Sequence, residues 1–211
     1  MRPRFLGAIK RKMDFFLFKK KHPNLICSNQ EIIYNHVIDR GRNNKIIIAK
    51  NSSLKNCSIQ FYGKNCILEI KDNVRIRDAV FWFEDEGGRI SIGPKTTMET
   101  GCQFASVEGK NIIIGEDCMF SHDVDVRTTD SHSILDMKGN RINPSEDVVI
   151  GNHVWIGIRV TILKGVKLAD NCMVAACSLV SSKTESKANT IIAGMPAVIV
   201  KNDINWDRRR L

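Results

Sequence analysis

Histidine side chains are the first candidates for chemistry in this chain, because imidazole exchanges a proton near neutral pH. The chain has five of them: His22, His36, His122, His132 and His153. His132 follows Asp130 by two residues in the segment TTDSHS. A carboxylate so placed could fix the tautomer of His132 through Nδ1, although a backbone carbonyl could do the same, and Asp130 could instead bind local amides. We therefore regard His132 either as a candidate general base whose orienting group stays open, or as a hydrogen-bonded imidazole that merely ends a coil.

The spacing of the other polar residues does not indicate a metal site. No HxxxH, HxxxxH or CxxC motif occurs, so we expect no bound metal. The seven cysteines make an odd count, and no secretory leader precedes them, so reduced thiols are expected rather than a disulfide framework. We expect a cytoplasmic protein, either free or at the inner face of the membrane.

The region that carries the histidines has a sixfold repeat. Every sixth residue is aliphatic in the series Ile150, Ile156, Ile162, Leu168, Val174 and Val180. Small or β-branched residues stand four positions after each, and six is not a multiple of the helical period of about 3.6. Upstream, isoleucines spaced by 22 at Ile48, Ile70, Ile92 and Ile114 indicate coils with four extra residues, which we assign to a corner. The pattern predicts a triangular solenoid of stacked parallel coils.

The same count suggests where the repeat is interrupted. Stepping by six from Ile114 through Phe120 and Val126 reaches His132, which places this residue on the inward register where the coil gives way to an insertion. The 36 residues from Ile114 to Ile150 correspond to two coils or to one coil plus a loop, and we expect an extruded loop at 127–147. We also expect tight backbone bends at four glycines that follow inward isoleucines: Gly93, Gly115, Gly151 and Gly157.

Three motifs carry a resemblance to a known family. IGNHVWIG, VTILKGV and AGMPAVIVK resemble the hexapeptide-repeat acyltransferases. Together with the TDSH and GNRIN segments, they look like the bacterial capsular polysaccharide and polysialic acid O-acetyltransferases. The resemblance covers about residues 90–206. It implies a left-handed parallel β-helix, a homotrimer with active sites between subunits, acetyl-CoA as donor and a glycan hydroxyl as acceptor.

The resemblance also implies roles for individual residues. His132 matches the general base on the loop, and Trp155 matches a tryptophan that lines the cleft between subunits, unless it only packs at the trimer interface. Positions that match the acetyl-CoA site are Gly157, Ala175, Ala176, Ser178, Gly194 and Lys201, with Lys183 as a second lysine for phosphate. Asn152, His153 and His122 face outward at corners, so they are candidates for acceptor contacts or are simply solvated.

Charge and domain organisation complete the expectations. The net charge of +9 calls for an anionic partner, and we expect an acidic glycan and no nucleic acid. Residues 1–45 form a basic, partly helical extension, and residues 1–21 either touch an anionic membrane or cap the core. The β-helix is expected over 46–182, followed by a C-terminal segment over 183–211.

Four functions are consistent with this reading. The resemblance favours O-acetylation of a capsular or lipopolysaccharide glycan, with sialic acid as one candidate sugar. The alternative enzyme is an N-acetyltransferase of a nucleotide-linked amino sugar. A non-enzymatic scaffold would not depend on His132, and a hydratase on the same solenoid would need three histidines around zinc.

Overall fold

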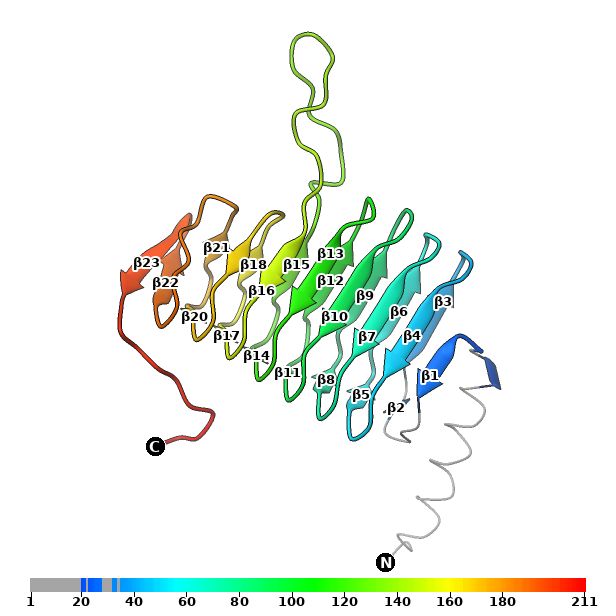
Figure 1. The fold of residues 1–211 in the computed structure, drawn as a ribbon, viewed down its shortest axis with the longest axis horizontal. Helices are drawn as coiled ribbons and strands as arrows, with labels where there is room; N and C mark the ends of the chain where they lie inside the picture. The colour runs from blue at the N-terminus through cyan, green and yellow to red at the C-terminus, as the bar shows by residue number, and fades with distance from the viewer. Residues whose placement is uncertain (1–19, 22, 28–31, 34) are drawn as a thin grey trace, which may run out of the picture.

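The computed structural model describes residues 20–21, 23–27, 32–33 and 35–211, and these form a stack of three-sided coils (Figure 1). Three sheets run along the stack, one for each side of the coil, and they contain seven, nine and seven strands. Strands of successive coils pair in parallel. The predicted all-β solenoid is therefore confirmed.

The first face is formed by β1 (Leu25–Cys27), β4 (Lys45–Ile48), β7 (Ile67–Ile70), β10 (Arg89–Ile92), β13 (Asn111–Ile114), β16 (Val148–Ile150) and β19 (Lys167–Leu168). The second face is formed by β2 (Ile32–Ile33), β5 (Ser53–Lys55), β8 (Arg75–Arg77), β11 (Thr97–Met98), β14 (Met119–Phe120), β17 (Trp155–Ile156), β20 (Met173–Val174), β22 (Ile191–Gly194) and β23 (Ala197–Lys201). The third face is formed by β3 (His36–Asp39), β6 (Ser58–Phe61), β9 (Val80–Phe83), β12 (Gln103–Ser106), β15 (Asp125–Arg127), β18 (Thr161–Ile162) and β21 (Leu179–Val180).

The sixfold series of aliphatic residues lies inside the prism. Each member is at most 4% exposed, and Ile150 pairs with Leu168 one coil later. Earlier coils keep the spacing of 22, as in the pair Ile48 and Ile70. Burying alternate residues on all three faces removes a continuous apolar column from water, which is the main stabilising contribution in such a stack. Burial also raises the pKa of the Cys102 thiol in this column to about 12, so that thiol packs and does not react at neutral pH.

We expected the four extra residues of each early coil to lie at one corner, and this expectation is wrong. They lengthen the strands of the first and third faces, which have four residues in β7 and β9 but two in β19 and β21. A longer strand adds hydrogen bonds and inward side chains, so the early coils enclose a wider core that holds Phe61, Phe81, Phe83 and Phe104.

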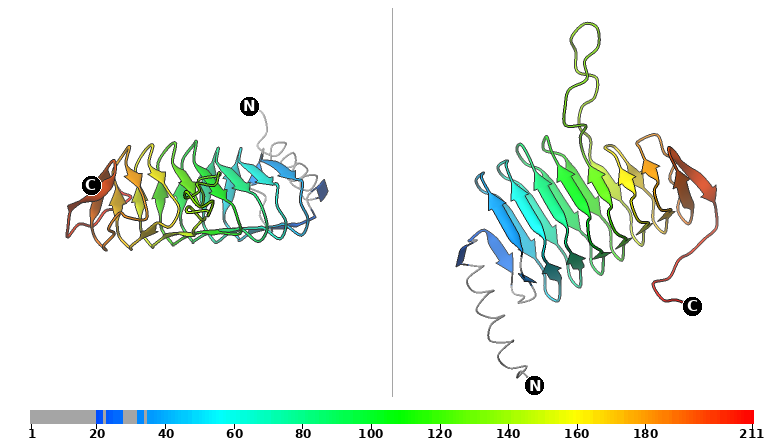
Figure 2. Two further views of the ribbon diagram at one scale, coloured as in Figure 1. Left: turned by 90° about the horizontal axis from the view of Figure 1, so that it is seen from above. Right: turned by 180° about the vertical axis from the view of Figure 1, so that it is seen from behind.

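The 36-residue interval is one coil plus a loop. Ile114 pairs directly with Ile150, and residues 128–147 leave the stack between β15 and β16 (Figure 1). An antiparallel bridge between Leu135 and Arg141 makes this loop a hairpin. The view from behind in Figure 2 shows it projecting from one edge of the prism. His132 is exposed in this loop, so the inward position that the sixfold count gave it is wrong, because the register ends at Val126.

The glycines after inward isoleucines serve close approach between coils rather than an unusual backbone angle. A Cβ on Gly93 would lie 2.3 Å from the Gly115 carbonyl oxygen, and one on Gly115 would lie 2.5 Å from the Gly151 oxygen. A left-handed backbone occurs instead at other corner positions, which are often Asn or Asp, such as Asn73, Asp117 and Asn171. Asn and Asp tolerate this conformation better than other L-residues do.

The ends of the stack extend beyond the repeat visible in the sequence. β1 pairs with β4 and β3 pairs with β6, so parallel pairing begins before position 46. The expected helix and membrane contact over residues 1–21 fall almost wholly outside the described residues. Within the described part of the chain, no helix has the length and hydropathy to cross a bilayer. After the antiparallel pair β22 and β23, the last residues turn back along the stack at the edge away from the loop (Figure 1).

Candidate active site

Asn143 holds together the two ends of the extruded loop. Its side chain is 8% exposed and donates to the carbonyl oxygen of His132 and to Oδ2 of Asp130, both at 2.9 Å. Its Oδ1 accepts from the amide of Ile134 at 2.7 Å. Because one buried amide group joins both arms of the hairpin, the backbone on either side of His132 is fixed.

Ion pairs fasten the same loop to the coils. Lys164, on the next coil, donates to Oδ2 of Asp130 at 2.5 Å and to the carbonyl oxygen of Asn143 at 3.0 Å. The hydrogen bonds from Lys164 and Asn143 hold the pKa of Asp130 below its ordinary value. Arg141 makes two hydrogen bonds to the Glu108 carboxylate, at 2.9 and 2.7 Å.

The His132 ring is exposed and makes no hydrogen bond within the described part of one chain. Its own amide donates to the carbonyl oxygen of Asp130 at 2.8 Å, whereas the Asp130 carboxylate is taken up by Lys164 and Asn143. The two residues therefore lie together, but Asp130 anchors the loop within the chain and does not touch the imidazole. The ring nitrogens of His132 are thus unoccupied in the described part of one chain.

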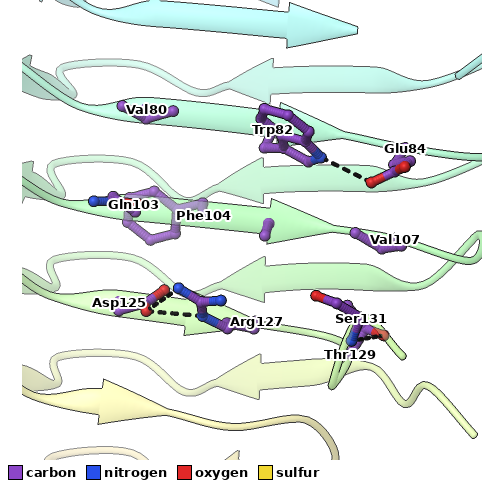
Figure 3. Close-up of a pocket in the computed structure, with 11 residues that line it drawn as sticks. Val80, Trp82, Glu84, Gln103, Phe104, Val107, Asp125, Arg127, Thr129 and Ser131 are labelled. Carbon is purple, nitrogen blue, oxygen red and sulfur yellow. Dashed lines mark hydrogen bonds and ion pairs between the residues drawn. The ribbon is translucent and has the colours of Figure 1, made fainter. Parts of the chain in front are cut away.

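A hollow of about 250 Å³ lies on the third face beside the loop (Figure 3). We call it the loop hollow. Its walls include Trp82, Glu84, Gln103, Arg127, Thr129 and Ser131, and Ala105 lies between Trp82 and Arg127 in register. The small side chain of Ala105 leaves the space that the larger neighbours enclose. Ser131 directly precedes His132, so the hollow opens next to the candidate base.

The polar groups of the loop hollow are already ordered. Arg127 donates through Nε and Nη2 to Oδ2 of Asp125, at 2.8 and 2.6 Å, and the Trp82 indole donates to Glu84 at 3.2 Å. An aromatic ring with carboxylates, a guanidinium and hydroxyl groups around it offers an apolar platform and several hydrogen-bonding groups. Such a mixture suits a small polar ligand better than a purely apolar one.

Trp155 projects outward from β17 on the second face, as predicted, between Met119 and Met173 of the neighbouring strands. Its indole Nε1 is buried without a hydrogen-bond partner in the described structure. The second face and the loop edge are different sides of the prism, and no bond or ring contact joins Trp155 to His132 in the described part of one chain. A cleft that contains both side chains requires two copies of the chain.

His153 belongs to a cluster that binds the C-terminal segment. Its ring stacks on Trp206 with centroids 4.1 Å apart, its Nδ1 lies 2.7 Å from Asp117, and its Nε2 lies 3.1 Å from the Trp206 carbonyl oxygen. Trp206 donates to the carbonyl oxygen of His153 at 2.8 Å and lies 6.1 Å from the Trp155 ring. Both ring nitrogens of His153 are thus engaged within the chain.

The other two candidates for acceptor contacts also have partners. Asn152 accepts the amide of Glu116 at 3.0 Å and donates through its own amide to Asp170 at 2.7 Å. His122 is exposed, and its Nδ1 lies 2.8 Å from the Thr100 hydroxyl. Asn152 therefore links three coils at their corners, and His122 keeps one ring nitrogen available.

The structure brings some of the candidate donor-site residues together. Ser178 donates to the carbonyl oxygen of Ala175 at 2.7 Å and accepts the amide of Gly194 at 3.2 Å, so the rung over 175–178 contacts the hairpin of β22 and β23. Gly157 is buried, and a Cβ there would lie 2.7 Å from the Ala176 amide nitrogen. Its small size is needed for stacking between coils.

The remaining donor-site candidates are exposed. Ala176 faces solvent beside the rung, while Lys183 follows β21 and Lys201 ends β23. Lys201 pairs with Ile191, at the end of the hairpin opposite Gly194. The two lysines are therefore not part of the Ser178 and Gly194 cluster. Among the described residues, no three His, Cys, Asp or Glu side chains gather closely enough to hold a metal ion.

Several residues of this region escaped the sequence analysis. Asn143 and Lys164 carry no motif, but the GNRIN segment already places an asparagine in the returning arm of the loop. Trp82 and Arg127 face outward from ordinary strands, where periodicity marks only the inward residues. Trp206 stands in a charged tail, and a lone aromatic there was the available signal.

Comparisons with known proteins agree with this architecture. The family model for the bacterial transferase hexapeptide (six repeats) matches residues 147–182. The polysialic acid O-acetyltransferase of Neisseria meningitidis is 41% identical over 126 residues, which are 59% of this chain and 58% of that protein. The match thus spans little more than half of that curated relative.

Two crystal structures resemble the chain over most of its length. The polysialic acid O-acetyltransferase OatWY has 33% identity and a TM-score of 0.68, and the superposition covers 86% of this chain and 91% of the other. The polySia-specific acetyltransferase NeuO has 29% identity and a TM-score of 0.70, with 83% of each chain covered.

Proposed function

Because the chain belongs to the hexapeptide-repeat bacterial transferases, which are left-handed parallel β-helices, we propose that it is an acetyl-CoA-dependent O-acetyltransferase. Its acceptor in this proposal is a hydroxyl of a bacterial cell-surface glycan, and an acidic capsular polysaccharide that contains sialic acid is the first candidate. The likeness to two polysialic acid acetyltransferases over more than four fifths of the chain supports the reaction and the acceptor class.

The observation that carries the proposal is the placement of His132. Its imidazole is exposed, has no partner in the described part of the chain, and stands on a backbone fixed by Asn143, directly after Ser131, which lines the loop hollow. A general base must be held firmly and still be free to reach a proton. No other histidine among the described residues combines these properties with a neighbouring hollow.

The transfer needs one proton to move twice. His132 takes the proton of the acceptor hydroxyl while the oxygen attacks the thioester carbonyl, which forms the new carbon–oxygen bond and a tetrahedral oxyanion. The carbon–sulfur bond then breaks, and the imidazolium returns the proton to the CoA sulfur. The products are the acetylated glycan and free CoA, so the imidazole ends in its starting state.

The proposal includes a homotrimer with active sites between subunits. The loop that carries His132 leaves the stack at the edge between the third and first faces, whereas Trp155 lies on the second face. In this proposal a neighbouring copy of the chain therefore brings its Trp155 beside His132. Trp155 then forms a wall of the cleft. Its indole N–H is buried without a partner in the described structure, so we expect it to donate a hydrogen bond to a ligand or to the neighbouring subunit in the trimer.

The donor site in this proposal lies along the late coils. The rung over 175–178 offers small side chains and backbone groups next to the Gly194 hairpin, which suits a long pantetheine arm. Lys183 and Lys201 are candidates for phosphate contacts. The donor is an intracellular metabolite, so we place the reaction in the cytoplasm, with residues 1–21 available for contact with the inner face of the membrane.

An acceptor assay tests the proposal. The purified protein is incubated with radiolabelled acetyl-CoA and either purified capsular polysaccharides or nucleotide-linked amino sugars. We expect label on the polysaccharide, in an ester that mild base removes. Label found only on the nucleotide sugar, as a base-stable amide, would replace this proposal by the N-acetyltransferase alternative.

A further inference from the structure

A second hollow adjoins the loop hollow along the turns that connect the third face to the first. It has a volume of about 620 Å³, and its walls include Arg40, Arg42, Tyr62, Lys64, Asp85 and Glu86. We call it the basic hollow. The extruded loop leaves the stack from the same row of turns, so both hollows and His132 lie along one edge of the prism.

An aromatic pair connects the two hollows. The rings of Tyr62, in the basic hollow, and Trp82, in the loop hollow, have centroids 4.4 Å apart. The Arg40 guanidinium lies over the Tyr62 ring, 5.2 Å from its centroid. Aromatic faces stack against the C–H faces of sugars as well as against cations, so the two hollows share a continuous platform.

The charges of the chain are separated along the stack. Residues 1–22 and 207–211 carry the whole net charge of +9, since the 21 Lys and Arg of residues 23–206 are balanced by 21 Asp and Glu. Within that neutral part, residues 40–77 hold nine Lys or Arg against two Asp or Glu, whereas residues 78–147 hold six against fourteen. The coils around the loop are therefore acidic, and an anionic ligand is favoured at the earlier coils instead.

Two cations of the basic hollow are available for a ligand. Lys64 is paired with Glu86 at 2.8 Å, but neither Arg40 nor Arg42 is ion-paired within the described part of the chain. Among the described residues that line the loop hollow, the one guanidinium is already paired with Asp125. Glu84 accepts the Trp82 indole N–H and can also accept hydrogen bonds from hydroxyl groups. The loop hollow thus suits the neutral, hydroxyl-bearing part of a sugar, and the basic hollow suits a carboxylate.

We propose that an acidic polysaccharide lies along this edge, with the sugar to be acetylated in the loop hollow and a carboxylate-bearing sugar further along the chain in the basic hollow. This inference rests on the proposed acetyl transfer to a glycan and names the substrate determinant that the base alone does not supply. The two hollows together extend from the turn after β3 to β15, which are four strands apart, or about 19 Å at a strand spacing of ~4.8 Å. One sugar cannot fill both hollows, so the edge selects a polymer.

A double charge reversal in the basic hollow tests this polymer track. The variant Arg40→Glu with Arg42→Glu is compared with Lys50→Glu plus Lys55→Glu, which makes the same charge change on neighbouring coils but at the first-to-second corner and on the second face. We expect the first variant to raise the KM for an acidic polysaccharide by about tenfold or more, from the loss of two charge-assisted contacts. The KM for acetyl-CoA and the turnover of a single-repeat fragment should stay unchanged, and the control variant should change the polymer KM less than about twofold.

A binding measurement separates this inference from the proposed reaction. Calorimetric titration of the polysaccharide into His132→Ala protein, without acetyl-CoA, reports the track even if no glycan is acetylated. Binding that is weakened by the Arg40 and Arg42 changes and not by the Lys50 and Lys55 changes supports it. Equal weakening by both pairs indicates a general charge effect, and unchanged polymer binding with lost binding to anionic vesicles indicates a membrane surface. Either result overturns the proposal.

Variants that fail to fold are replaced by milder ones. Thermal unfolding followed by circular dichroism identifies such cases, and Arg40→Gln with Arg42→Gln removes the two charges without adding carboxylates. Trp82→Ala provides a second view, because Trp82 lines the hollow that receives the acetylated sugar. It should weaken binding of the single-repeat fragment and of the polymer alike, whereas the arginine variants should affect the polymer alone. An arginine variant that weakens fragment and polymer equally would also overturn the track.

Discussion

At the scale of single residues, His132 and Asp130 lie close together but have different roles, because Asp130 anchors the loop and His132 carries the proposed base. The Asp130 carboxylate is occupied by Lys164 and Asn143, and the His132 ring has no partner in the described part of the chain. An unsupported imidazole on a fixed backbone can rotate to meet a substrate. No side chain of the described part of one chain orients the ring, so the ligand and a second copy of the chain are the first candidates for an orienting group.

Replacement of the proposed base tests its role. We expect His132→Ala to lower turnover by at least about two orders of magnitude, which is the usual contribution of general-base catalysis. Far-ultraviolet circular dichroism and the melting temperature should stay unchanged, because the removed ring is exposed and makes no bond within the described chain. His36→Ala, which removes another exposed imidazole at the start of β3, serves as the control and should retain full activity.

Asp130→Asn distinguishes an anchoring role from a direct one. If Asp130 only fastens the loop, the lost pair with Lys164 is worth at most about 1 kcal/mol, and turnover should fall by no more than about fivefold. Limited proteolysis should then show faster cleavage within residues 128–147. A loss as large as that of His132→Ala, with the loop still resistant to protease, would instead assign Asp130 to the imidazole in the assembled site.

At the scale of elements, each turn of the solenoid requires a residue with a left-handed backbone. Asn and Asp fill many of these positions, whereas Lys95, His153, Arg159 and Cys177 are less suited to them. A left-handed conformation costs an ordinary L-residue roughly 1–2 kcal/mol. The His153 ring offsets this cost with its contacts to Asp117 and Trp206, while the exposed Arg159 side chain has only a 4.0 Å approach to Asp123.

Arg159→Asn should therefore stabilise the protein. Asparagine adopts the observed φ of 56° with less strain and keeps the backbone bond to the carbonyl oxygen of His122. We expect a gain of about 0.5–1 kcal/mol, or a melting temperature roughly 1–4 °C higher. Lys167→Asn makes the same kind of exchange in the strand β19, where no strain exists, and a comparable gain there would contradict the explanation.

The elements also show how far the sequence could be read. Inward residues repeat, so the period of six locates Ile150 and its series, and the interval of 36 locates the loop. The count fails at His132 because the chain leaves the stack after Arg127, and a count by six does not itself mark the residue at which the chain departs. Outward residues such as Trp82 and Arg127 do not repeat, so the hollows that they line become visible only when the coils are stacked.

At the scale of the whole molecule, a solenoid is held together by contacts between neighbouring coils, and the C-terminal segment adds contacts across several coils. We call residues 202–209 the C-terminal strap. Ile204 pairs with Asn189, Trp206 with His153, and Arg208 with Asp117, Thr97 and the carbonyl oxygen of Cys118. The strap partners lie at or beside turns that lead to the second face on several coils. No sequence period could predict the contacts of Trp206 and Arg208, because their partners lie 53 or more positions away.

Removal of the C-terminal strap should lower the stability of the stack at neutral pH. It should also reduce the amount of stability that the protein loses when the pH falls. Burial raises the pKa of the Asp117 carboxyl, but the hydrogen bonds from His153 and Arg208 outweigh burial, and the pKa lies below its ordinary value. A carboxyl with a lowered folded-state pKa stabilises the protein above its unfolded pKa of about 3.9, and this contribution is lost as the pH falls through the folded value.

Truncation after residue 201 should lower the melting temperature at pH 7 by several degrees, since each 1 kcal/mol corresponds to about 2–4 °C in a chain of this size. Between pH 5 and pH 3 the intact protein should lose more stability than the truncated one in chemical denaturation, and parallel losses would show that Asp117 does not depend on the strap.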